Sequence, residues 1–123
     1  MIRKEIYTID QVLSEVKSYD AKEGKRYVDF DGDLMKMESQ RYRLFKRDGT
    51  VCIKCKLKGT FFRKEKHLHD TQYHFNLYGY DINGKEVLFT KDHIIPKSKG
   101  GKNILTNYQV MCFNCNHEKG NKV

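Results

Sequence analysis

Long hydrophobic runs and prolines are both scarce in this sequence of 123 residues. No stretch approaches the ~20 consecutive apolar residues that a membrane-spanning helix requires, so the sequence predicts a water-soluble protein. The single proline, Pro96, and the lack of low-complexity tracts indicate no linker and no domain boundary. A chain of this length forms about one compact domain, which excludes a multidomain enzyme with a separate cofactor-binding half.

The first residues also lack the features of an export or targeting segment. They contain no uninterrupted apolar core, and they include the acidic residues Glu5, Asp10 and Glu15. A secretory signal needs such a core, and a transit peptide is poor in acidic residues. We therefore expect the protein to stay where it is made, in the cytoplasm, where thiols remain reduced.

Positive charge is in excess and is unevenly distributed. The chain has 24 Lys and Arg against 16 Asp and Glu, a net charge of +8. Residues 1–50 hold 11 basic and 10 acidic groups, whereas residues 51–123 hold 13 and 6. A basic domain usually faces a polyanion, most commonly nucleic acid, although the charge could also serve solubility alone.

Four cysteines form two pairs with the same spacing, Cys52 with Cys55 and Cys112 with Cys115. Two residues between the sulfurs let both thiolates of a pair reach one tetrahedral zinc ion, and two pairs complete a closed site. Two disulfides would be the alternative in an exported protein. For a cytoplasmic chain we predict a structural zinc with no open coordination position.

Local sequence patterns predict a mixture of helices and strands. Thr8 and Gln11 form a capping-box pattern, and Asp31-Gly32 and Asn83-Gly84 are typical of hairpin turns. The predicted elements are a helix over residues 9–18, strands over 27–30 and 34–37, a helix over 40–46 capped by Ser39, strands over 75–80, 86–90 and 108–111, and a helix over 116–121. Residues 56–74 are ambiguous, and no element is predicted there.

Residues after the second predicted hairpin have the side chains that phosphodiester hydrolysis needs, namely a base for water and ligands for a metal. His93 is the candidate base. Asp92 and Asn116 offer oxygen ligands that suit Mg²⁺ or Mn²⁺. Asn107 can hold the backbone of the preceding loop, and Lys119, one helical turn beyond Asn116, is expected near a phosphate.

These motifs resemble those of the HNH endonucleases, which have a ββα-metal core. The resemblance covers residues 87–120, through D-H-I-I-P-x-S-K-G-G, N-Y-Q and C-x-x-C-N-x-x-K-G, and extends back to R-D-G-x-x-C-x-x-C near residues 47–55. It implies a His-Asn-Asn variant with His93 as general base, Asp92 and Asn116 as ligands of the catalytic metal, and Asn107 orienting the loop. Some members have a further histidine ligand where this chain has Gly120, so a hard ion, Mg²⁺ or Mn²⁺, is expected rather than a softer transition metal.

Several residues have alternative interpretations. His117 could replace Asn116 as a ligand, although neighbouring helical residues point about 100° apart and only one can face the ion. His67, His69 and Asp70 could form a second metal site or could simply face solvent or DNA. Three loop lysines are either solvated or in contact with the nucleic-acid backbone: Lys97, Lys99 and Lys102.

The predicted architecture is an α+β fold with a zinc-stapled HNH nuclease core over residues 51–123 and a helix-and-hairpin extension over residues 1–50 packed on it. The predicted function is metal-dependent hydrolysis of DNA phosphodiester bonds, on double-stranded DNA in a bacterial or phage-infected cell. The alternatives are a non-catalytic, zinc-stabilised nucleic-acid-binding module and an accessory nuclease of a phage or mobile-element complex.

Overall fold

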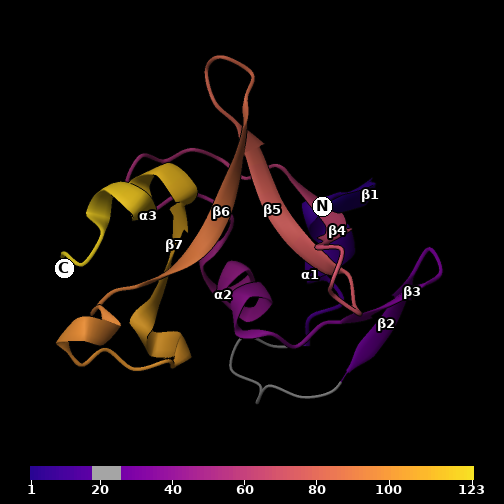
Figure 1. Ribbon diagram of the computed structural model, residues 1–123, viewed down its shortest axis with the longest axis horizontal. Coiled ribbons are helices and arrows are strands. Elements are labelled where there is room, and N and C mark those ends of the chain that lie inside the picture. The colour runs from indigo at the N-terminus through magenta and orange to yellow at the C-terminus, as the bar shows by residue number, and fades with distance from the viewer. Residues whose placement is uncertain (18–25) are drawn as a thin grey trace.

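An antiparallel sheet of five strands organises the molecule (Figure 1). The computed structural model describes residues 1–17 and 26–123. In the order in which they pair, the strands are β1 (Ile2–Tyr7), β4 (Phe61–Lys66), β5 (His74–Tyr80), β6 (Glu86–His93) and β7 (Tyr108–Cys112). The predicted mixture of helices and strands is confirmed, and the sheet joins strands from both sides of residue 50. Of the helices in the described residues, none is long and apolar enough to cross a membrane.

Strand β1 and strand β4 were not predicted from the sequence. Strand β1 lies at the edge of the sheet, and four of its six residues are exposed, so it lacks an apolar alternation that would indicate a strand. Strand β4 buries the charged Lys64 and Glu65 as well as its aromatic residues. Its sequence therefore also lacks the alternation of apolar and polar residues that would indicate a strand. Strand β1 therefore depends on a partner that is distant in the sequence, and the buried Lys64 of β4 depends on the distant Glu5 and Asp33.

Helix α1 (Ile9–Leu13) begins as predicted but ends early. The Thr8 side chain accepts a hydrogen bond from the main-chain N–H of Gln11, and the Gln11 side chain accepts one from the main-chain N–H of Thr8, which confirms the capping box. The predicted helix over 9–18 is too long, because the chain tightens into a turn in which Val16 N–H bonds to the carbonyl of Leu13. Residue 18 lies outside the described residues.

The first predicted hairpin forms a separate two-stranded sheet of β2 (Tyr27–Phe30) and β3 (Asp33–Lys36), which projects from one end of the main sheet (Figure 1). The buried Lys64 ammonium attaches it to β4 by donating to the carbonyl of Phe30 at 2.7 Å and by pairing with Glu5 and Asp33 at 2.9 Å. Burial would lower the pKa of Lys64, but hydrogen bonds to Asp33 and Glu5 raise it, so this lysine stays charged.

Helix α2 (Gln40–Asp48) crosses one face of the sheet and extends the predicted 40–46 helix by two residues (Figure 1). Ser39 caps its first turn, as predicted, and Gly49 ends it with a φ of 85°. Near its end, the Arg47 guanidinium donates to the carbonyls of Leu105 and Tyr108, both at 3.1 Å. The helix therefore also holds the start of β7 in place.

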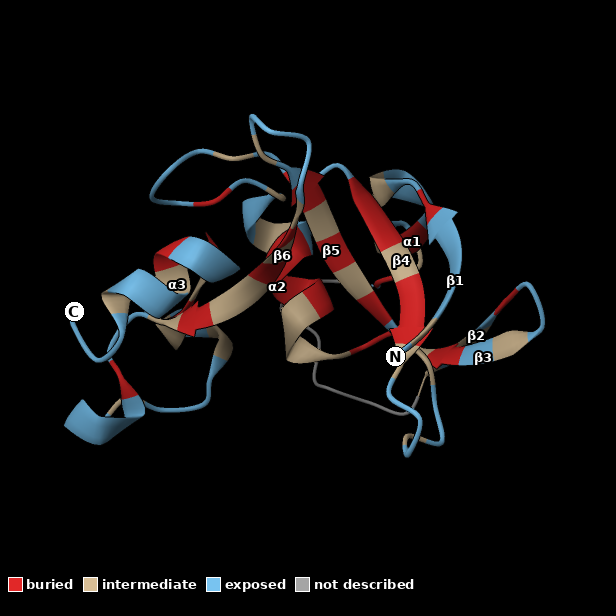
Figure 2. Ribbon diagram, turned by 45° about the horizontal axis from the view of Figure 1, so that its top comes forward, coloured by how far each residue is buried: buried red, intermediate tan, exposed pale blue. Residues whose placement is uncertain are grey.

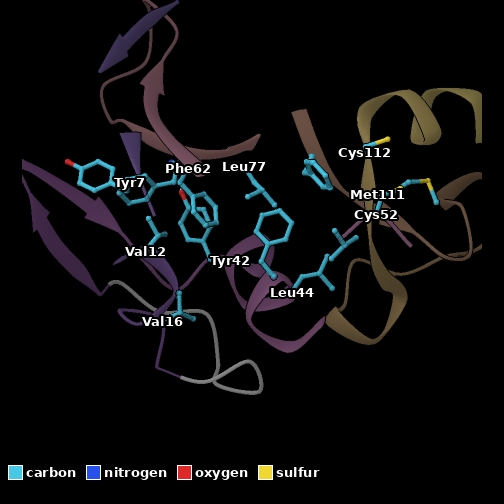
Figure 3. Close-up of a cluster of buried hydrophobic side chains, with 14 of the residues drawn as sticks. Tyr7, Val12, Val16, Tyr42, Leu44, Cys52, Phe62, Leu77, Met111 and Cys112 are labelled. Carbon is cyan, nitrogen blue, oxygen red and sulfur yellow. Dashed lines mark hydrogen bonds between the residues drawn. The ribbon is translucent and has the colours of Figure 1, made fainter. Parts of the chain in front are cut away.

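One continuous core runs from the N-terminal region to the cysteines (Figure 3). At one end, the rings of Tyr7, Phe30 and Phe75 pack edge to face with centroids 4.8–5.4 Å apart. Cys52 and Cys112 lie at the other end (Figure 3). Buried positions form bands along β4, β5 and α2, whereas β1 is largely exposed (Figure 2).

The C-terminal part of the chain follows the predicted order. Strands β5 and β6 surround the Asn83-Gly84 turn, and β6 pairs with β7. Helix α3 (Phe113–Lys119) begins three residues before the predicted 116–121 helix and contacts both β6 and β7. Its early start matters for the site, because it puts Cys115 and Asn116 on a formed helix.

Candidate active site

An open pocket of about 250 Å³ lies where the end of β6 meets α3. Strand β6 contributes Asp92 and His93, and α3 contributes Asn116 and Lys119. Although neighbouring strand residues normally point to opposite sides, both Asp92 and His93 reach this pocket at the end of the strand. The structure thus brings together the four residues that the sequence singled out for base, metal and phosphate chemistry.

Asp92 is a buried carboxylate held by two side chains. It is only 4% exposed, and its Oδ2 accepts a hydrogen bond from Gln109 on the paired strand β7 at 2.9 Å. The Lys119 ammonium lies 3.0 Å from the same oxygen and also donates to the carbonyl of His93 at 2.7 Å. The pocket therefore holds a fixed negative charge that already attracts one cation.

Asn116 points into the pocket with a defined amide orientation. Its Nδ2 donates to the hydroxyl of Thr90 at 2.8 Å, and that hydroxyl donates to the carbonyl of Met111 at 2.8 Å. The Asn116 nitrogen is thus engaged, which leaves its carbonyl oxygen as the donor atom for an ion. The neighbouring His117 does not line the pocket, and its ring stacks on Phe113 with a centroid distance of 5.9 Å.

His93 is held on two sides. Its Nε2 lies 2.8 Å from the side-chain oxygen of Asn103, and its ring meets Tyr108 edge to face at 4.8 Å. Because an amide oxygen only accepts, Nε2 is the donor in this contact, and a neutral ring with this tautomer has its lone pair on Nδ1. Asn103 was not singled out in the sequence, because nothing in its spacing links it to His93.

The loop between β6 and β7 is tied together by Asn107. Its Oδ1 accepts from the N–H of Ile95 at 3.0 Å, and its Nδ2 donates to the carbonyls of Ile95 and Lys102 at 3.1 and 3.0 Å. A Cβ at Gly101 would lie 1.7 Å from the carbonyl oxygen of Ile95, so only glycine fits there. This closed loop carries Asn103 to the histidine.

We expect Asn107→Ala to destabilise the protein by about 1–3 kcal/mol, because it leaves several loop hydrogen bonds unmade. Asn107→Asp is the matched variant, since it keeps the acceptor for Ile95 N–H but replaces the donating Nδ2 with a carboxylate oxygen that faces the carbonyls of Ile95 and Lys102. Thermal unfolding should rank the wild type above both variants. Equal unfolding temperatures for all three proteins would show that these bonds do not support the loop.

The four cysteine sulfurs form a cluster in which all atoms lie within 4.8 Å of one another. The Cys55 and Cys112 sulfurs are 3.8 Å apart, the separation of about 3.8 Å expected along the edge of a tetrahedron with zinc–sulfur bonds of about 2.3 Å. Burial would raise the pKa of Cys52, but hydrogen bonds from the backbone lower it to about 6, which favours a thiolate at this position, whereas burial raises the pKa of Cys112 and Cys115. The cluster is compatible with a zinc site.

The cluster joins two distant parts of the chain. Cys52 and Cys55 lie in a turn closed by a bridge between Val51 and Lys58, and Cys112 is the residue at which β7 gives way to α3. The position of α3, and with it Asn116, is therefore linked to the segment before β4.

The remaining predicted residues lie at or away from this pocket. Lys97 lines it, whereas Lys99 and Lys102 are exposed on the same loop without lining it. His67 and His69 stack on each other at the turn between β4 and β5. Within residues 1–17 and 26–123, the four cysteines are the only group in which three or more His, Cys, Asp or Glu side chains bring metal-ligating atoms together. The second metal site considered at His67, His69 and Asp70 therefore receives no support.

Residues 81–123, about a third of the chain, match the family model described as HNH endonuclease. The match includes β6, β7, α3 and the residues named above around the pocket. The resemblance inferred from the sequence motifs is thereby confirmed for this part of the chain. Searches of curated proteins and of solved structures gave no match.

Proposed function

We propose that this protein is a metal-dependent endonuclease that hydrolyses phosphodiester bonds in double-stranded DNA. The single observation that carries the proposal is the pocket at the end of β6, which gathers Asp92, His93 and Asn116 inside the region that matches the HNH endonucleases. An imidazole, a carboxylate and an amide at one point are what a nuclease needs, and a protein that only binds DNA has no use for them.

In this proposal His93 is the general base. Its Nδ1 accepts the proton of the attacking water, while the bond from Nε2 to Asn103 keeps the ring oriented. Tyr108 packs edge to face against the ring and limits its rotation. Asn107 acts indirectly by holding the loop, and therefore Asn103, in place.

Asp92 and Asn116 would hold the catalytic metal. Their oxygen donors suit Mg²⁺ or Mn²⁺ better than a soft transition metal, in keeping with the absence of a further histidine at Gly120. When bound, such an ion stabilises negative charge on the phosphate and on the leaving 3′-oxygen. Lys119 adds a second positive charge in the same pocket.

We further propose that the four cysteines bind a structural zinc ion and that Lys97, Lys99 and Lys102 contact the DNA backbone. Four thiolates leave no position open for substrate, so this metal would hold the fold and not take part in hydrolysis. Together with residues 81–123, the zinc-bound turn would complete the ββα-metal core, with residues 1–50 as an extension packed on it.

A cleavage assay on supercoiled plasmid that compares Mg²⁺, Mn²⁺, Zn²⁺ and EDTA tests this function. We expect nicked or linear product with Mg²⁺ or Mn²⁺, none with EDTA, and recovery when Mg²⁺ is returned in excess. Little or no product is expected with Zn²⁺ alone, because the two hard ligands favour the other ions. DNA binding without cleavage under every condition would instead identify a nucleic-acid-binding module.

A further inference from the structure

A second pocket, of about 390 Å³, borders the candidate active site and is not used by the proposed chemistry. Its walls come from the end of β3, the first turn of α2, the residues just before β5, and Lys91 on β6. Most of this lining lies outside residues 81–123, the part that matches the HNH endonucleases. We call it the α2 groove.

The α2 groove adjoins the candidate active site at Lys91. Lys91 lines both pockets, and its ammonium donates to Gln40 Oε1 at 3.2 Å. Gln40 in turn donates to the carbonyl of Asn103 at 3.1 Å, and the side chain of Asn103 binds His93. A chain of direct contacts therefore leads from the proposed base to the first turn of α2.

Among the described residues, the fully charged side chains that line the α2 groove are all basic. Lys36, Arg41 and Lys91 line it, and no acidic residue does so among the described residues of its wall. Arg41 is fixed by bonds to Asn76 and to the carbonyl of Phe75 at 2.9 and 2.6 Å, so its charge is held in position. Burial and the nearby Arg41 charge lower the pKa of His74, which therefore contributes a polar group and little charge at neutral pH.

We propose that the α2 groove binds the phosphate backbone of the DNA strand that leads away from the candidate active site. The proposal rests on the proposed function for the choice of DNA as the polyanion. Cations that line a groove adjoining the candidate active site would bind phosphates next to the scissile one and fix the register of the substrate. Through Lys36 and Arg41, residues 1–50 would then take part in substrate binding.

Two single variants test the groove. Lys36→Gln removes one cation, and Gln72→Glu places a carboxylate at an exposed position of the same wall. At about 0.1 M salt, each is expected to weaken binding of a short duplex about tenfold, and Lys36→Gln should lower the slope of log affinity against log salt by about 0.9. Fluorescence anisotropy without added Mg²⁺ or Mn²⁺ measures both quantities while the DNA stays intact.

Lys85→Gln is the matched control, because it removes the same charge at an exposed site before β6, at the opposite end of that strand from His93. It should bind the duplex like the wild type. Unchanged binding in both groove variants, or equal weakening by Lys85→Gln and Lys36→Gln, overturns the proposal. Thermal unfolding confirms that each variant is folded, and Gln72→Glu tests the groove even if Lys36→Gln loses stability.

These results separate the groove from the proposed function. Weaker binding by the groove variants together with no plasmid cleavage in any metal would support the groove and reject the nuclease. Plasmid cleavage together with wild-type binding by both groove variants would support the nuclease and reject the groove.

Discussion

Replacing His93 by alanine is expected to lower the rate of plasmid cleavage by about 10²- to 10⁴-fold, the usual contribution of a general base. The imidazole lines the pocket beside Asp92, its Nε2 contacts Asn103, and in the proposed mechanism its Nδ1 accepts the proton of the attacking water. Single-turnover cleavage of supercoiled plasmid with saturating Mg²⁺ measures the change in the chemical step. DNA binding should remain close to that of the wild type.

His117→Ala is the matched comparison for this experiment. It removes an imidazole from the same part of the chain, but that ring is exposed, stacks on Phe113 and does not line the pocket. We expect it to keep cleavage and so to distinguish the two histidines as well as to control for general damage. Wild-type cleavage by His93→Ala, or an equal loss in both variants, would reject His93 as the base.

Local signals in the sequence located the elements that carry the site but not their ends, since β6 runs three residues past the predicted 86–90 strand and α3 begins three residues before residue 116. The Asn83-Gly84 turn and the apolar residues on either side predicted the β5–β6 hairpin, because short hairpins are specified by their turn residues. Strand β4 could not be found in this way, since its buried Lys64 and Glu65 are stabilised by residues from other segments. Lys64 pairs with Glu5 and Asp33, and Glu65 binds Arg3, Asn76 and Tyr78.

The candidate site was predictable in its principal residues and not in the residues that position them. Asp92, His93 and Asn116 stand in a recognisable motif, whereas the role of Gln109 depends on the register that places it opposite Asp92 across β6 and β7. A role for Thr90 near the site was weakly indicated by its position, because it lies two residues before Asp92 and so faces the same side of the strand. Asn103 depends on the closed loop, which only the folded structure reveals.

Removal of the metal proposed at the four cysteines is expected to unfold the protein or make it insoluble. Apparent zinc-binding energies of structural sites reach about 10–16 kcal/mol in zinc-finger peptides, and typical small domains are stable by only about 5–15 kcal/mol. The cluster also provides the link between α3 and the turn that contains Cys52 and Cys55. Zinc analysis of the purified protein should give about one ion per chain, and a strong chelator should lower its unfolding temperature sharply.

A comparison of Cys55→Ser with Cys112→Ser separates loss of metal from loss of packing. Cys55 is exposed, whereas Cys112 is 2% exposed and belongs to the core. If the cysteines act through a shared ion, both variants should lose zinc and stability to a similar extent, because each removes one ligand. If they act through packing, only Cys112→Ser should be destabilised. A wild-type protein with four titratable thiols, no bound metal and the same unfolding temperature in chelator would contradict the zinc proposal outright.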